Sequence, residues 1–219
     1  MNSSLLSLLV LAGIAIFLIL RLRSVLGTRE GFEKPTVRPV PSRADARRDF
    51  EVIEGGPDDD ITDHVENDSE AAKALAAMKM AERGFNVREF LQGARGAYEM
   101  ILMAFERGDV DTLRTFLADD VMETFEGVIR DREAQGLSID AEFVGIRELA
   151  LQNATFDRAT NEAEVTVRFV AELTSVVRNA EGQIVEGDAS EIKRQRDVWT
   201  FARTMGSDDP NWVLVATDG

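Results

Sequence analysis

The side chains best suited to metal binding or acid–base chemistry gather in one acidic tract. Residues 51–70 contain nine Asp or Glu, no Lys or Arg, and His64, the only histidine of the chain. Clustered carboxylates could bind calcium, but the tract lacks the ligand spacing of a twelve-residue calcium-binding loop. A run of like charges is typical of a solvated segment, so we predict no metal site there.

The rest of the sequence offers little for catalysis. It has no cysteine, which excludes disulfides, thiolate metal sites and thiol nucleophiles. The phosphate-loop, dinucleotide-binding, zinc-protease and serine-hydrolase motifs do not occur in it. Acid–base catalysis would need an inward carboxylate or histidine, and after residue 70 there is no histidine and no aspartate that strand alternation directs inward. We therefore predict no catalytic residue, no cofactor and no enzymatic activity.

The first 22 residues are typical of a transmembrane anchor. Residues 1–20 carry no charged side chain, and a helix from Leu5 to Leu20 would rise about 24 Å at about 1.5 Å per residue. A cleaved export signal is the alternative, but the run lacks a preceding positive segment and a small-residue cleavage site. Arg21 and Arg23 follow the run, so the positive-inside rule places the rest of the chain in the cytoplasm, with these two arginines at the lipid head groups.

The charge of the chain divides sharply along its length. Residues 1–50 hold eight Lys or Arg and four Asp or Glu, a net charge of +4, whereas residues 51–219 hold 17 and 36, a net charge of −19. A basic segment beside a membrane is attracted to anionic lipid, whereas an acidic domain is repelled by anionic lipid and by nucleic acid. We therefore expect the membrane as a partner and no nucleic acid.

Between anchor and folded domain we predict a basic collar and a disordered tether, residues 23–69. Three prolines in residues 35–49, followed by the acidic tract, leave few apolar side chains for a core. In the collar, charge attraction alone would not require two glycines and an aromatic ring. We predict that a turn here contacts a protein partner or the folded domain through Gly27, Arg29, Gly31 and Phe32.

From residue 70 onward, helical periodicity is followed by strand alternation. Helices are expected over 69–84, with Ala72, Leu75, Ala76 and Met80 on the apolar side, over 86–107, and between Asp109 and Gly136. We interpret Gly93 and Gly96 as positions where another backbone approaches closely. Strands are expected over 141–156, 162–178, 189–204 and 211–217. The fold class predicted is α+β, with helices packed on one face of a curved four-stranded antiparallel sheet.

Several segments together resemble one family. The anchor, the collar LGTREGFEKP, the helical stretch FLQGARGAYEMILMAFERGDVDTLRTFL and the closing strands RDVWTFART and PNWVLVATDG resemble the Tim44-like family, in its bacterial TimA-type branch of membrane-anchored adaptors. The resemblance covers nearly the whole chain except the tether. It implies a Tim44-like domain over residues 70–219, related to the cone-shaped nuclear-transport-factor-two architecture, and a location in the bacterial inner membrane with a periplasmic N-terminus.

The resemblance also implies a hydrophobic pocket between helices and sheet. From alternation and helix phase, its lining is expected to include Tyr98, Phe105, Phe125, Phe143, Phe169, Trp199, Phe201 and Trp212. Mitochondrial relatives are inner-membrane adaptors that recruit a heat-shock-seventy motor to a translocation channel. Their long motor-binding region is replaced here by the anchor and tether, so motor recruitment does not transfer with the resemblance.

The function expected is therefore that of a cytoplasm-facing, non-enzymatic adaptor in protein translocation or membrane-protein handling. Its partners would be translocation machinery, a chaperone or a membrane protein, and a hydrophobic or lipid ligand could occupy the pocket. Two alternatives stay open. One is a ligand-binding or isomerase/dehydratase-like enzyme that uses the cone pocket, and the other is an anchored oligomerisation module.

Overall fold

The structure is a computed structural model and describes residues 58–218. The anchor predicted for residues 1–22 lies outside this range, as do Arg21 and Arg23 and the collar residues Gly27, Arg29, Gly31 and Phe32. Within residues 58–218, no helix combines the length and the apolar character needed to cross a bilayer.

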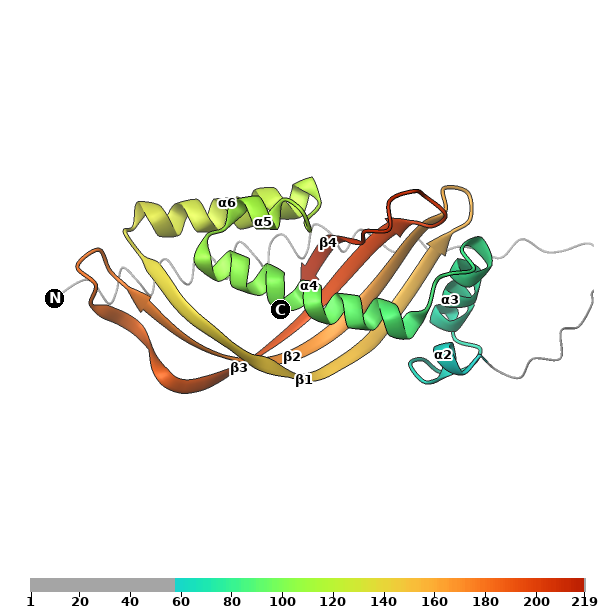
Figure 1. The fold of residues 1–219 in the computed structure, drawn as a ribbon, viewed down its shortest axis with the longest axis horizontal. Helices are drawn as coiled ribbons and strands as arrows, with labels where there is room; N and C mark the ends of the chain where they lie inside the picture. The colour runs from blue at the N-terminus through green and yellow to red at the C-terminus, as the bar shows by residue number, and fades with distance from the viewer. Residues whose placement is uncertain (1–57, 219) are drawn as a thin grey trace, which may run out of the picture. The chain divides into compact units, whose positions relative to one another are not determined.

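A four-stranded antiparallel sheet forms the centre of the domain, as predicted. Its strands are β1 (Ser138–Asp157), β2 (Glu162–Arg178), β3 (Ile184–Thr204) and β4 (Val213–Asp218), and they lie in the order β1-β2-β3-β4. Three register shifts interrupt the pairing of β1 with β2. Such bulges bend and twist a strand, which accounts for the strong curvature of the sheet in Figure 1.

The alternation of β2 separates the two faces of the sheet. Val165, Val167 and Phe169 are fully buried toward the helices. On the opposite face, Glu172 is the one buried charged residue of the described chain, and it accepts hydrogen bonds from the guanidinium groups of Arg147 and Arg194. Buried carboxylates need such partners, so this triad joins β1, β2 and β3 on the solvent side.

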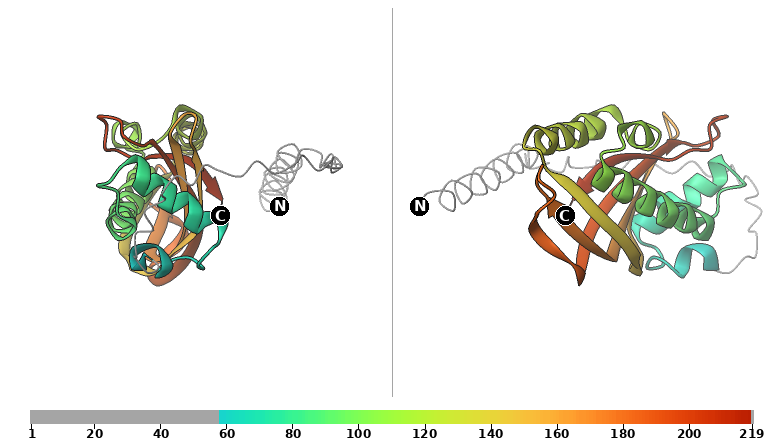
Figure 2. Two further views of the ribbon diagram at one scale, coloured as in Figure 1. Left: turned by 90° about the vertical axis from the view of Figure 1, so that its right-hand side faces the viewer. Right: turned by 60° about the vertical axis from the view of Figure 1, so that its left-hand side comes forward.

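The longest helix within residues 58–218, α4 (Val87–Arg107), lies across the concave face of the sheet (Figure 1 and Figure 2). Asn86 caps its first turn, and Gly108 ends it in the left-handed conformation that favours glycine, with φ of 70°. Asp109 caps the short helix α5 (Val110–Leu113), and α6 (Asp119–Ala134) follows. The helices expected between Asp109 and Gly136 are therefore confirmed.

The helix expected over 69–84 is present as α3 (Glu70–Ala81), capped by Ser69. It packs against the sheet through Leu75 and Met78, which are fully buried. The predicted apolar side was wrong at Ala76, which is exposed, and at Met80, whose side chain is 82% exposed. Because alanines and two methionines surround the helix, hydrophobic spacing alone poorly defines which side packs against β1.

The predicted disorder is wrong for residues 58–69, where the chain forms α2 (Asp59–Thr62) and a turn that leads into α3. Ile61 is buried, with 5% of its surface exposed. Asp60 accepts hydrogen bonds from the backbone N–H groups of Val87, at 2.8 Å, and Arg88, at 3.1 Å. Asp60 also pairs with Lys79 Nζ at 2.7 Å. The acidic residues thus satisfy the free N–H groups at the start of α4, which composition cannot reveal.

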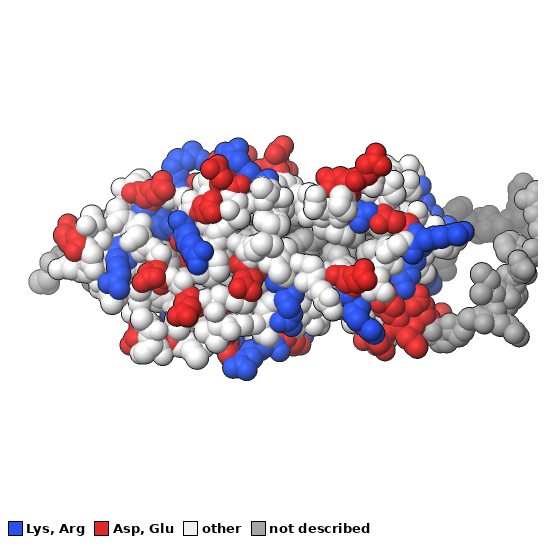
Figure 3. All heavy atoms as spheres, viewed as in Figure 1, with Lys and Arg blue, Asp and Glu red and all other residues white. Residues whose placement is uncertain are grey.

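Charge is unevenly distributed over the domain surface. On the face shown in Figure 3, Asp and Glu gather at the end that carries α2, whereas Lys and Arg are more scattered.

Partial burial acts to raise the pKa of the Asp60 carboxyl, but Lys79 and the amide donors of Val87 and Arg88 outweigh it and hold that pKa below its ordinary value. The Asp60 charge is thus stabilised by the fold.

Candidate functional site

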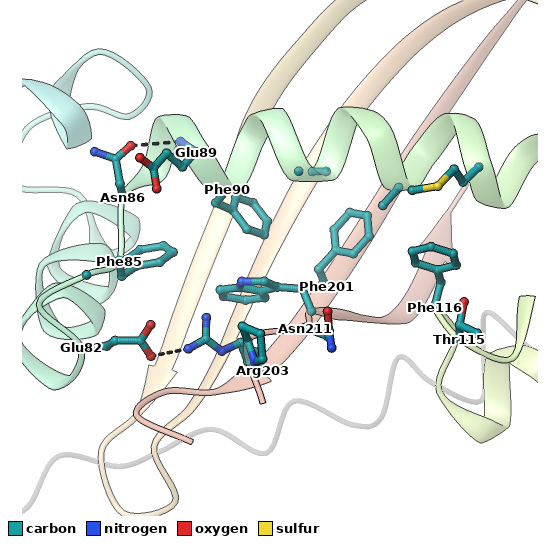
Figure 4. A pocket seen from close by; sticks show the side chains of 17 residues that line it. Glu82, Phe85, Asn86, Glu89, Phe90, Thr115, Phe116, Phe201, Arg203 and Asn211 are labelled. Atoms are coloured by element: carbon teal, nitrogen blue, oxygen red, sulfur yellow. Dashed lines mark hydrogen bonds and ion pairs between the residues drawn. The ribbon is translucent and has the colours of Figure 1, made fainter. Parts of the chain in front are cut away.

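An aromatic groove opens between the N-terminal half of α4, the end of β3 and the segment before β4. Its cavity volume is about 360 Å³. Figure 4 shows side chains from these elements turned toward one another across the opening. The groove is lined by five aromatic rings, Phe85, Phe90, Phe116, Phe201 and Trp212, together with Glu82, Arg203, Met100 and several small or polar residues.

Three of these rings meet at the start of α4. Phe85 and Phe90 flank the capping residue Asn86 at the positions of a hydrophobic staple, with ring centroids 6.5 Å apart. Trp212 packs on both, 4.7 Å from Phe90 with the rings at 61° and 6.0 Å from Phe85. Edge-to-face contacts of this kind contribute about 0.5–1.5 kcal/mol each beyond burial. The groove therefore has a preformed aromatic floor.

Small residues on α4 keep the groove open. A Cβ atom added to Gly93 or Gly96 would meet nothing within 4 Å, apart from the helix backbone itself. The predicted close approach of another backbone is therefore wrong at both glycines. Gly93 instead borders the groove beside Ala94 and Ala97, where a larger side chain would fill the space. Glycine destabilises a helix interior relative to alanine, and at Gly93 its lack of a side chain leaves space that a ligand can occupy.

One wall of the groove holds a partly buried arginine. Arg203 is 10% exposed and pairs with Glu82, which also accepts the backbone N–H of Gly206 at 2.8 Å. Its guanidinium carbon lies 5.9 Å from the ring centroid of Trp212. Its Nε–H is buried and has no hydrogen-bond partner among residues 58–218. Buried donors are rarely left unpaired.

The Glu82–Arg203 pair should appear in the acid stability of the domain. Arg203 first, and then the Gly206 amide, hold the pKa of the Glu82 carboxyl below its ordinary value of 4.5. A lowered folded-state pKa adds stability that is present above the unfolded pKa and is lost as pH falls through the folded value. We expect Glu82→Gln to be less stable than the parent at pH 7 and to lose less stability between pH 5 and pH 3. Melting temperature against pH measures this, with Glu89→Gln in the same groove as control. A parallel acid loss in Glu82→Gln and the parent would contradict it.

The eight residues expected to line a single pocket are separated by the structure. Phe201 and Trp212 line the aromatic groove. Phe105, Phe125 and Trp199 line a second, smaller cavity. Tyr98, Phe143 and Phe169 line neither cavity. Tyr98 and Phe169 belong to the packed core, where they stack with centroids 4.3 Å apart, and Phe143 is partly buried against that core. The groove residues that the prediction missed include Phe85, Phe90, Phe116, Glu82 and Arg203; the staple spacing around Asn86 is the signal that could have identified the first two.

The prediction that no aspartate is directed inward is wrong at Asp197. This residue lies on β3 in phase with Trp199 and Phe201, and its Oδ2 accepts a hydrogen bond from the Tyr98 hydroxyl at 2.5 Å. Burial, and then the neighbouring Asp197 charge, raise the pKa of Tyr98, so its hydroxyl stays protonated. Polar residues on both sides hid the phase of this strand. The buried tyrosine nevertheless required an acceptor.

Comparison with known proteins places the domain. Residues 71–219 match the Tim44-like domain. The human mitochondrial import inner membrane translocase subunit TIM44 is 24% identical over 143 residues, which cover 65% of this chain and 31% of the relative. A probable mitochondrial import inner membrane translocase subunit of Caenorhabditis elegans, tin-44, is 22% identical over 151 residues, which cover 67% of this chain and 35% of the relative. This chain therefore spans about a third of the length of these relatives.

Among solved structures, the intermembrane space region of the chloroplast protein ARC6 is similar, with a TM-score of 0.41 and 10% identity, over 58% of this chain and 94% of that one. The match of residues 71–219 extends over more than half of the sequence, from α3 to the last strand of the sheet. The chain belongs to the family of Tim44-like domain proteins.

Proposed function

We propose that this chain is a membrane-anchored, cytoplasm-facing adaptor without enzymatic activity, which acts in protein translocation or membrane-protein handling. In this proposal the aromatic groove binds an apolar segment of a polypeptide. The observation that carries the proposal is the groove itself, in which an aromatic floor lies beside the guanidinium group of Arg203.

The groove combines the two kinds of contact that peptide binding needs. Apolar side chains that enter it would gain about 25 cal/mol for each Å² of apolar surface removed from water. Arg203, which lines the groove, would offer a charged donor to a backbone carbonyl of the bound segment. Apolar walls with a few fixed polar groups are typical of binding pockets in proteins. No covalent chemistry is required of the site.

The family match supports the biological setting. Two relatives are named as mitochondrial import inner membrane translocase subunits, one of them as a probable subunit, and residues 71–219 of this chain, which include the groove, match the Tim44-like domain. To this we add, as parts of the proposal, the anchor over residues 1–22 with Arg21 and Arg23 at the head groups, the collar contact, the TimA-type subfamily and the cone-shaped architecture. Translocation machinery, a chaperone or a membrane protein would be the partner.

Site-specific photo-crosslinking tests the groove in cells. A photoreactive amino acid in place of Met100, which lines the groove and is 47% exposed, should give discrete polypeptide adducts after illumination. The matched control is Val128, which is 49% exposed on α6 and lines neither cavity. We expect the adducts from Met100 to fall at least fivefold when Trp212 is also changed to Ala, because the floor of the groove is lost. Equal adducts from Met100 and Val128 would refute polypeptide binding in the groove. Adducts with the mass of a lipid would indicate that the groove binds a hydrophobic ligand instead of a polypeptide.

A further inference from the structure

The smaller cavity differs in chemistry from the aromatic groove. It lies between the C-terminal half of α4, α6 and the inner face of β3 and β4, with a volume of about 190 Å³. Its walls combine three aromatic rings with two carboxylates and a few neutral residues: Leu102, Phe105, Phe125, Gln195, Asp197, Trp199, Thr217 and Asp218. None of the described residues that line it is a Lys or Arg.

The aromatic rings that line the cavity are fixed by packing on their neighbours. Phe105 and Phe125 lie with centroids 4.8 Å apart at 60°, and Trp199 is buried against Tyr98, 4.6 Å from its ring centroid. The face of an aromatic ring carries partial negative charge and attracts a cation within about 6 Å of the centroid. The domain already uses this attraction, since the guanidinium carbon of Arg132 lies 5.6 Å from the centroid of Phe105.

The carboxylate of Asp197 is held in place by hydrogen bonds and forms no ion pair within residues 58–218. Its Oδ2 accepts the Tyr98 hydroxyl at 2.5 Å, and its Oδ1 accepts Gln195 Nε2 at 3.1 Å. Both partners are neutral, and neither Asp197 nor Asp218 takes part in the ion pairs found within residues 58–218. A carboxylate beside aromatic faces lacks a positive partner here, which a bound cation would supply.

We infer that this cavity binds an organic cation, with an alkylammonium group seated against Phe105, Phe125 and Trp199 and facing the carboxylate of Asp197. The cavity volume limits the bound part to a small head group, such as a trimethylammonium or the end of a lysine side chain. This site is separate from the aromatic groove, so it stands or falls independently of the proposed adaptor function.

Titration with choline tests the inference on the full-length chain in a neutral maltoside detergent. Calorimetry gives the affinity, and the indole NMR signal of Trp199 reports the location. The neutral isostere 3,3-dimethylbutan-1-ol has the same shape without the charge, and we expect it to bind at least tenfold more weakly. Asp197→Asn, which keeps an acceptor for Tyr98, should weaken choline binding about tenfold. Phe125→Leu removes one ring face at similar volume and should weaken it several-fold, whereas Phe156→Leu, on the far part of β1, should leave it unchanged.

The arms of the experiment also separate the sources of the cation. Tighter binding of N-acetyl-lysine methylamide than of choline would assign the site to a lysine of a polypeptide, and the reverse would assign it to a free quaternary amine. Both results support an organic-cation site. Equal binding of choline and its neutral isostere, absence of binding by either cation, or unchanged choline affinity in both Asp197→Asn and Phe125→Leu would overturn the inference. If Asp197→Asn does not fold, Phe125→Leu and the isostere still decide it.

Discussion

Replacing Phe169 with alanine is expected to lower the free energy of unfolding by about 3–5 kcal/mol, the range for a fully buried phenylalanine. Phe169 lies on β2 with no exposed surface and stacks on Tyr98 at 4.3 Å. It also approaches Trp199, with centroids 5.8 Å apart. The cavity left behind would lie between α4 and the sheet, where neighbouring rings cannot easily collapse. Urea unfolding followed by circular dichroism measures the change.

The same substitution at a less buried ring provides the control for Phe169. Phe116→Ala removes a half-buried side chain at the edge of the aromatic groove and should cost about 1–2 kcal/mol, in proportion to the smaller buried area. A loss at Phe169 no larger than that at Phe116 would show that the core between α4 and β2 is not closely packed.

Replacing Asp60 with alanine is expected to destabilise the domain by about 2–3 kcal/mol, since hydrogen bonds to charged groups contribute about 1.5–3 kcal/mol. The change would leave the N–H groups of Val87 and Arg88 without their acceptor and would remove one partner of Lys79. Thermal unfolding of the full-length chain at pH 7 measures the loss.

The neighbouring residue Asp59 is the matched control for Asp60. It has the same side chain in the same helix, but its carboxylate is exposed and takes part in no hydrogen bond or ion pair within residues 58–218. Asp59→Ala should therefore change stability by about 0.5 kcal/mol or less. If both substitutions had the same small effect, the acidic segment would not be part of the folded unit.

The sheet could be predicted because its strands alternate clearly, as in Val165, Val167 and Phe169 against polar neighbours. Helix ends could also be predicted where a capping side chain or a glycine marks them, as at Ser69 and Gly108. The orientation of α3 could not be predicted, because alanine and methionine on several sides of the helix leave its apolar side poorly defined. Folding of residues 58–69 was hidden because it depends on Asp60 reaching the amides of Val87 and Arg88, about 27 residues away.

The candidate sites were harder to predict than the fold, because periodicity shows which side chains face inward but not which ones leave space. Phe169 and Phe201 have the same inward phase, yet Phe169 fills the core whereas Phe201 borders the groove. The space beside Phe201 depends on Gly93 and Ala97, whose lack of bulk has a meaning only once α4 is placed across the strands. The position of Arg203 in the groove could not be predicted either, because arginine side chains are mostly exposed.

The bonds between α2 and α4 have a mechanical consequence if the protein is anchored at its N-terminal side, as proposed above. Tension that enters the domain at residue 58 would load Asp60 and its partners before it reached any strand, because β1 begins only at Ser138. These bonds join α2 to the beginning of the long helix that lies across the sheet (Figure 1). A pull from that side would thus act on the start of α4 before it acted on the hydrogen bonds between strands.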